Sequence, residues 1–410
     1  MMHNCFQAAD ILIPQHISMT KWSCVACDQY SSQVEYWDRV RDFVGDAPST
    51  YHMIFPEALL RQGAGKERID AGHQHMQEYL DAGILHTFRR SFIYVERTMV
   101  SGKTRRGLMG AIDLEEYDFH PGAPAHIRAT EGTVQERIPP RMELLRGAAM
   151  ELPHVLLLCD DKKDGILSAA KEAAGEKLYD FDLMEDGGRI RGWLISGLGV
   201  SLVNSAVSAY IAATEAAQGG GSTMSFAVGD GNHSLAAAKG CWEELKPTLT
   251  KEERISHPAR YALVELENVH DDAIEFEPIH RVVKGDKLEL LMDRLRAKSQ
   301  EGGYPVTMVT KAGRETVYLP RQESPLALAI LQPMLDQFAA ETGATMDYIH
   351  GEDVTVALSQ AENTLGLILP GMEKDSLFPG VLAGGVLPRK TFAMGHANDQ
   401  RYYLEGKMRR

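Results

Sequence analysis

Cysteine and long apolar runs are both scarce in this sequence. Its 410 residues include five cysteines, an odd number that is too sparse for a disulfide framework. No stretch approaches the roughly 18 consecutive apolar residues that a membrane-spanning helix needs, and the first ten residues lack the charged-then-apolar plan of a secretory signal. These absences lead us to expect a cytoplasmic protein with reduced thiols.

Basic residues are also in deficit. The chain carries 43 Lys and Arg against 57 Asp and Glu, a net charge of -14. An acidic surface repels nucleic acid and anionic lipid, so we expect no nucleic-acid or membrane partner and a small molecule as the ligand. The length suggests two or three structural units, and a homo-oligomer stays open.

Hydrophobic spacing predicts a mixed α+β fold, in which helices flank a mixed sheet. Strands are expected over residues 9–14, 91–97, 105–114, 154–160, 225–228, 260–268, 274–283, 304–319 as a hairpin, 354–358 and 365–369. Helices are expected over residues 34–43, 67–82, 139–149, 197–218, 235–246, 288–298 and 326–342. A boundary near residue 286 divides the chain into a motif-bearing domain, 1–286, and a smaller C-terminal α/β unit, 287–410, that folds back on the site.

Residues 226–234, Phe-Ala-Val-Gly-Asp-Gly-Asn-His-Ser, indicate chemistry most directly. Two glycines flank Asp230 where an apolar strand ends, so the backbone can approach a ligand closely. Ser234 is expected to cap the helix 235–246, whose first amides and positive dipole end would face the same ligand. A strand, loop and helix start of this kind predicts an anion site. The strands at 260–268 and 274–283 are its expected neighbours.

The side chains of this loop suit phosphate chemistry. Asp230 could hold a metal ion or take a proton from a hydroxyl, and His233 could donate to a phosphate oxygen or relay a proton. A tight turn, in which Asp230 and Asn232 bond to their own backbone, is the alternative that these residue types also fit. The histidine and the adjoining helix start favour the ligand site.

A second candidate segment, residues 125–137, mixes arginine, threonine and glutamate. Guanidinium groups match phosphate oxygens, while hydroxyls and the Gly132 amide can fill further contacts. Glu131 could be the base that takes a proton from an acceptor hydroxyl. A solvated charged loop explains this composition about as well.

The loop at 226–234 resembles the Asp-Gly-His-His-Arg signature of the domain of unknown function 1015 family, which is placed in the ParB and sulfiredoxin-like superfamily. The resemblance extends to the His-Arg pair at 280–281 and to residues 387–392, Leu-Pro-Arg-Lys-Thr-Phe, which are similar to that family's Pro-Lys-Ser-Thr-aromatic ending. The chain departs from the signature at Asn232, where the family has His, and at Ser234, where it has Arg.

The resemblance implies a ParB/sulfiredoxin-like core and phosphoryl transfer with ATP or ADP and Mg²⁺. Together with the residue chemistry, it implies that Glu131, Asp230 and His233 are catalytic and that Asp230 holds the metal ion. Nucleotide binding is expected from Arg128, Thr130, Thr133, Arg137, Gly231, Asn232, Ser234, His280, Arg281, Lys390 and Thr391. The leading hypothesis is a kinase-like phosphotransferase acting on a small hydroxylated metabolite such as a free amino acid.

Two alternative functions stay open. The first is a nucleotide-binding regulatory protein without turnover. The departures at Asn232 and Ser234 favour it, because both remove groups that could stabilise charge in a transition state. The second is a metal-assisted hydrolase built on Asp230, His233 and His270.

Two further clusters are expected to be structural rather than functional. Cys24 and Cys27 lack a second cysteine pair at zinc-site spacing, so both are expected to be packed thiols. His73 and His75 lie two residues apart in a predicted helix and therefore on different faces. We expect these two histidines at the surface.

Overall fold

The computed structural model describes residues 4–30, 33–60, 65–133, 135, 138–153, 155–220 and 223–410. The chain divides into two compact units. Unit 1 comprises Met1–Ala129, Thr133–Ile274 and His396–Arg410, and unit 2 comprises Thr130–Gly132 and Glu275–Gly395. The break after Ile274 precedes the expected boundary near residue 286, because the strand Phe276–Lys284 (β13) hydrogen-bonds to later strands of the chain.

Unit 1 is built on a large mixed sheet. Its described strands are β1 Phe6–Gln7, β2 Ala9–Pro14, β3 Leu85–Thr98, β4 Thr104–Asp113, β5 Tyr117–Asp118, β6 Ile127–Ala129, β8 Leu156–Cys159, β9 Lys177–Asp182, β10 Arg189–Ile195, β11 Phe226–Asp230 and β12 Tyr261–Asn268. They follow the order β5-β6-β11-β8-β12-β4-β3-β10-β9, with β1 beside β4 and β2 beside β3. The expectation that β12 and β13 flank β11 is wrong, because β11 pairs with β6 and β8.

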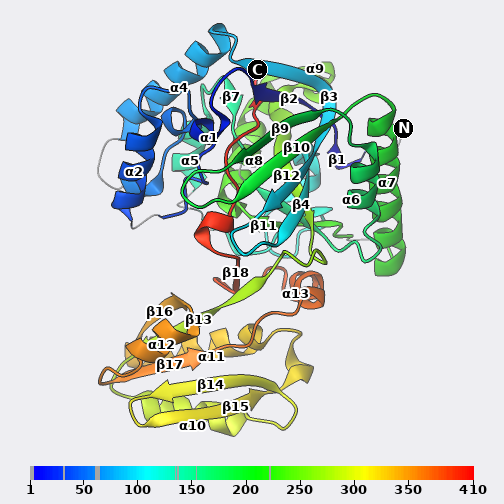
Figure 1. Cartoon of the computed structure of the whole chain (residues 1–410). Coiled ribbons are helices and arrows are strands. Elements are labelled where there is room, and N and C mark those ends of the chain that lie inside the picture. The colour runs from blue at the N-terminus through cyan, green and yellow to red at the C-terminus, as the bar shows by residue number, and fades with distance from the viewer. Residues whose placement is uncertain are drawn as a thin grey trace. The chain divides into compact units, whose positions relative to one another are not determined.

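Both faces of this sheet are apolar and covered. Along β12, Ala262, Val264 and Leu266 join one core with the helices α6 (Gly165–Ala173), α7 (Leu198–Gln218) and α8 (Asn232–Leu245). Leu263 points to the opposite core, which includes α2 (Val34–Val44) and the buried residues Tyr402, Tyr403 and Leu404. Figure 1 shows α6 and α7 on one side of the strands and α2 on the other. Period-two alternation therefore sends apolar side chains into two cores.

The remaining elements of unit 1 are short, apart from α4. They are α1 Met19–Trp22, η1 Thr50–His52, α3 Glu57–Leu60, α4 Gly65–Asp81, η2 Leu114–Glu116, α5 Ile138–Leu145, β7 Met150–Glu151, η4 Lys246–Thr248, α9 Lys251–Ser256, η5 Pro258–Arg260, η8 Ala397–Asp399 and β19 Lys407–Met408. The C-terminal segment threads through the unit, because Tyr402 bridges Val25, Gly406 bridges Leu12 and β19 pairs with β7.

Unit 2 is a smaller sheet with helices packed against it. Its described elements are β13, α10 Leu288–Lys298, β14 Tyr304–Thr310, β15 Gly313–Leu319, η6 Arg321–Glu323, α11 Ala327–Thr342, β16 Thr345–His350, α12 Glu352–Leu358, β17 Thr364–Ile368, η7 Lys374–Ser376, α13 Leu377–Gly384 and β18 Phe392–Met394. The strand order is β15-β14-β17-β13-β16, with β18 beside β13. Leucines of α10 and α11 pack on β14, β15 and β17 to form its core.

A mixed sheet with flanking helices is confirmed as the fold class. The strand expected at 354–358 is wrong, because these residues belong to α12, whose first turn carries Glu352 and Asp353 at the positive end of the helix dipole. Among the described residues, every helix is too short or too polar to cross a bilayer.

Candidate functional site

The predicted loop joins β11 to α8 with one residue between them. The pairing of β11 with β8 is irregular between Val228 and Asp230, and Gly231 follows with a φ of 84°. That left-handed conformation suits glycine and turns the chain directly into α8, which begins at Asn232. The expectation that Ser234 caps a helix starting at residue 235 is therefore wrong, because Gly231 occupies the cap and Ser234 lies in the first turn.

The polar side chains of this loop lie at the start of α8. Asp230, His233 and Ser234 are half-buried and Asn232 is buried. Asp230 Oδ1 accepts a hydrogen bond from the Gly231 N–H at 2.8 Å, as the turn interpretation requires. The positive end of the helix dipole meets a carboxylate and an imidazole here, so the loop combines an anion-attracting backbone with acid-base groups.

Arg128 lies on the strand next to this loop. β6 runs parallel to β11, with Arg128 opposite Ala227, so both strands end at the same edge of the sheet. The guanidinium is buried, its Nε donates to the carbonyl of Ala125 at 2.9 Å, and burial lowers its pKa. That Nε–H is thus used within the protein rather than offered to a ligand.

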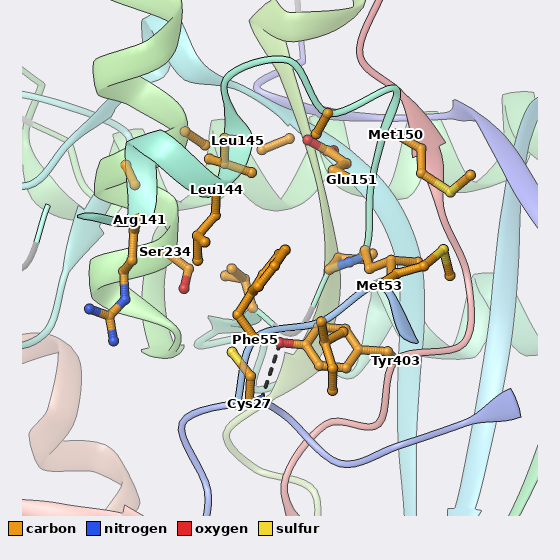
Figure 2. A pocket seen from close by; sticks show the side chains of 18 of the residues that line it. Cys27, Met53, Phe55, Arg141, Leu144, Leu145, Met150, Glu151, Ser234 and Tyr403 are labelled. Atoms are coloured by element: carbon orange, nitrogen blue, oxygen red, sulfur yellow. Dashed lines mark hydrogen bonds between the residues drawn. The ribbon is translucent and has the colours of Figure 1, made fainter. Parts of the chain in front are cut away.

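A cavity of about 180 Å³ opens beside the first turn of α8 in unit 1. Ser234 and Ala238 line it from α8, Arg141 and Leu144 from α5, and Cys27 from an earlier loop (Figure 2). Tyr403 of the C-terminal segment closes another side, where its hydroxyl accepts a hydrogen bond from the Cys27 N–H at 3.2 Å. The structure therefore places a hollow directly against the predicted loop.

One buried carboxylate, that of Glu151, lines this cavity and already has partners. Its Oε1 accepts a hydrogen bond from the Leu263 N–H at 2.8 Å. Lys407 Nζ lies 3.6 Å from the same oxygen, and Arg409 lies 3.3 Å from Oε2. Lys407 and Arg409 thus compensate the negative charge of Glu151, and most of the other residues that line the cavity are apolar.

Unit 2 brings a second set of predicted residues together around Glu131. The Leu387 N–H donates to the Thr130 carbonyl at 2.7 Å, and Glu131 forms a β-bridge with Leu387. Burial raises the pKa of the Glu131 carboxyl, while the charge and backbone N–H of Lys390 and the charge of Arg281 oppose that shift. A carboxyl whose pKa is raised by burial is better matched to general-base chemistry than a solvated one.

Arg281 holds the segment that carries Lys390. Its guanidinium is fully buried and donates to the carbonyls of Arg389 and Lys390, both at 2.9 Å. It also lies 4.8 Å from the centre of the Tyr348 ring. Thr391 in turn donates to the carbonyl of Pro388. Arg281 is thus a structural anchor for the loop in this unit.

The neutral state of His280 in unit 2 should make the stability of the fold depend on pH. His280 is buried, burial lowers its pKa, and its Nδ1 accepts a hydrogen bond from the Leu369 N–H at 3.1 Å, which requires the neutral ring. Because the folded pKa lies below the unfolded value of about 6.5, its contribution to stability is complete above that pH and is lost as the pH falls through the folded pKa.

We therefore expect the free energy of unfolding, measured by denaturant titration, to decrease as the pH drops below about 6.5. His280→Asn should flatten that part of the pH dependence, whereas His86→Asn at an exposed position should not. An identical pH dependence in wild type and His280→Asn would contradict the assignment.

The structure sorts the predicted residues into two groups. Unit 1 carries the residues Arg128, Thr133, Asp230, Gly231, Asn232, His233 and Ser234, and unit 2 carries Thr130, Glu131, His280, Arg281, Lys390 and Thr391. Arg137 lies outside the described residues. His270, expected in a hydrolase site, is 2.6 Å from Asp160 Oδ1.

Comparison with protein families gives one match that covers most of the chain. The family described as "Protein of unknown function (DUF1015)" matches residues 11–370. The chain belongs to the DUF1015 family. No curated protein matches it.

Solved structures similar to this DUF1015 chain are distant. A conserved hypothetical protein from Pyrococcus furiosus shares 12% identity at a TM-score of 0.34, over 72% of this chain and 90% of that one. A free serine kinase in complex with AMP shares 12% identity at 0.35, over 72% and 86%. SbnI from Staphylococcus aureus shares 9% at 0.37, over 70% and 81%. At these TM-scores the likenesses carry no argument about function.

Sequence reasoning missed several polar residues of the DUF1015 cavity. Arg141, Glu57, Glu151 and Tyr403 come from four separate segments and share no motif. Cys27 was expected as a packed thiol; it is half-buried at the cavity, and burial raises its pKa to about 12. Asp28 and Gln29, polar residues that follow Cys27 in the sequence, would have been the natural guess for a pocket wall, but of these three residues Cys27 alone lines the cavity.

Proposed function

We propose that this DUF1015 protein binds a nucleotide and transfers a phosphoryl group to the hydroxyl of a small metabolite. The observation that carries the proposal is the junction of β11, Gly231 and α8, which puts a carboxylate and an imidazole at the positive end of a helix. Phosphoryl transfer requires mainly positioning and charge neutralisation, and such a junction supplies both. We further propose that the core is ParB/sulfiredoxin-like.

Each proposed role follows from the chemistry of the side chain. Asp230 is a half-buried carboxylate at a strand end, and one carboxylate with substrate phosphates is a donor set that Mg²⁺ accepts. A bound Mg²⁺ would neutralise phosphate charge. His233 donates a hydrogen bond to a phosphate oxygen. Glu131, whose pKa burial raises, takes the proton from the acceptor hydroxyl.

The proposal is tested by incubating the protein with Mg²⁺, ATP or ADP, and a pool of hydroxylated metabolites. Phosphorus NMR should show a new phosphate ester and a matching loss of nucleotide phosphate. The control omits the metabolite pool, which separates transfer to an acceptor from transfer to water. Nucleotide loss at the same rate without acceptors, giving inorganic phosphate, would instead support the hydrolase.

A second candidate function, nucleotide binding without turnover, is favoured by a specific observation. Arg128 and Arg281 were expected to contact phosphate, yet both are buried and donate to backbone carbonyls. Fewer cations would then be available to stabilise charge in a transition state. Saturable nucleotide binding by calorimetry, with no product over many hours, would support this function.

A further inference from the structure

The cavity beside α8 has the size and lining of a site for a ring-sized apolar group. Its volume is about 180 Å³. For comparison, an engineered protein cavity of about 150 Å³ with an apolar lining binds benzene. The space therefore suits a single six-membered ring with a small substituent.

The buried end of the cavity is almost wholly apolar. Met53, Phe55, Met150, Ala238 and Leu263 line it, and all five are buried. Methionine side chains adapt their shape to an irregular guest. A charged or strongly hydrated molecule would lose its water there and gain few partners, because the buried carboxylate, Glu151, is already held by Lys407 and Arg409.

Four polar lining residues, Cys27, Glu57, Arg141 and Ser234, are half-buried and so partly open to solvent, whereas Glu151 and Tyr403 are buried. Arg141 and Glu57 form an ion pair with side chains about one-fifth exposed. Figure 2 shows Arg141 and Ser234 on the same side of the cavity, away from Met53 and Met150. A guest with an apolar body inside would thus present its polar end to the first turn of α8.

We infer that this cavity binds a small amphipathic molecule with one ring-sized apolar body and a hydroxyl-bearing head directed at Ser234. That this molecule is the phosphoryl acceptor rests on the proposed function, since its hydroxyl would lie at the start of α8, where the phosphate is expected. Binding itself does not depend on that function. The substrate class that this cavity favours is an apolar alcohol rather than a free hydrophilic amino acid.

The test uses three probes and the full chain. Benzyl alcohol has one ring and a hydroxyl, 2-naphthylmethanol has two rings, and glycerol has hydroxyls without an apolar body. We expect saturable binding of benzyl alcohol with a Kd in roughly the millimolar range or tighter, and no binding of glycerol, by calorimetry or ligand-observed NMR.

Two substitutions at one position change the cavity in opposite directions. Leu144 lines it and is half-buried, so its replacement disturbs packing less than a change in the core. Leu144→Phe should weaken the binding of benzyl alcohol by about tenfold or more, because the larger side chain fills the cavity. Leu144→Ala should shift the preference toward 2-naphthylmethanol. Leu202→Phe and Leu202→Ala, at an exposed position of α7 outside the cavity lining, serve as controls.

Opposite shifts at Leu144 with none at Leu202 would support the site, since a general loss of stability cannot produce both. Failure of benzyl alcohol to bind, or binding that the Leu144 variants leave unchanged, would overturn it. Competition by adenosine would also overturn it, because the cavity would then hold the nucleotide base. Probe binding without phosphoryl transfer would leave this site standing while the proposed function fails.

Discussion

Asp230→Asn should lower the rate of phosphoryl transfer by about 10²- to 10⁴-fold while leaving the Tm nearly unchanged. The amide oxygen can still accept the hydrogen bond that Gly231 N–H gives to Asp230 Oδ1, so the turn is retained. The substitution removes the negative charge on which a role toward Mg²⁺ or a proton depends. Initial rates by phosphorus NMR and thermal unfolding of the same preparations measure the two quantities.

Asp182→Asn provides the matched control for this experiment. Asp182 is an exposed carboxylate at the end of β9, where it pairs with Arg189, so the same chemical change should affect neither rate nor Tm. A large drop in Tm for Asp230→Asn with activity intact would assign Asp230 to the turn alone. Unchanged activity and unchanged Tm would remove it from the site altogether.

The fold class was predictable because apolar residues in most segments recur with the spacing of a helix or of a strand. The helix expected at 288–298 is α10 with the same bounds, and the strand expected at 9–14 is β2. The spacing of apolar residues did not predict the structure of residues 354–358. Residues 354–358 are apolar enough for a strand, but they form α12, in which Thr355 is buried and acids occupy the first turn.

The strand end and helix start at 226–234 were predictable from the sequence, whereas the cavity beside them was not. Glycine and a polar run mark where β11 ends, and this signal is local in the sequence. The cavity depends on contacts between residues hundreds of positions apart, such as Cys27 with Tyr403. Side chains that meet only through the fold leave no spacing signal in a single sequence, so Arg141 and Glu57 could not be paired in advance.

The charged residues of β12 show the same limit. Alternation along 260–268 puts Glu265 and Glu267 on the face of Leu263, a pattern that usually marks a solvated side of a sheet. Both glutamates are buried, because Arg105 and Arg401 pair with them. Gly107 of β4 leaves room for one of these carboxylates, since a Cβ at this position would lie 2.1 Å from Glu265 Oε1.

Arg401→Ala should reduce the free energy of unfolding by about 3–5 kcal/mol, the cost typical of breaking a buried ion pair. Arg401 is 2% exposed, and its Nε lies 2.9 Å from Glu265 Oε2. It also pairs with Glu405, which accepts a hydrogen bond from the Tyr179 hydroxyl as well. Truncation leaves two buried carboxylates without their cation, and it weakens the hold on the C-terminal segment. Denaturant titration measures the loss.

A combined variant separates the charge effect from lost packing. Arg401→Met with Glu265→Gln and Glu405→Gln removes all three charges while keeping similar volumes, so it should recover much of the stability lost in Arg401→Ala. Arg296→Ala, which removes an exposed guanidinium paired with Glu315, should change the free energy of unfolding little. If the triple variant is no more stable than Arg401→Ala, the ion pairs of Arg401 with Glu265 and Glu405, rather than the packing of its stem, hold the C-terminal segment in unit 1.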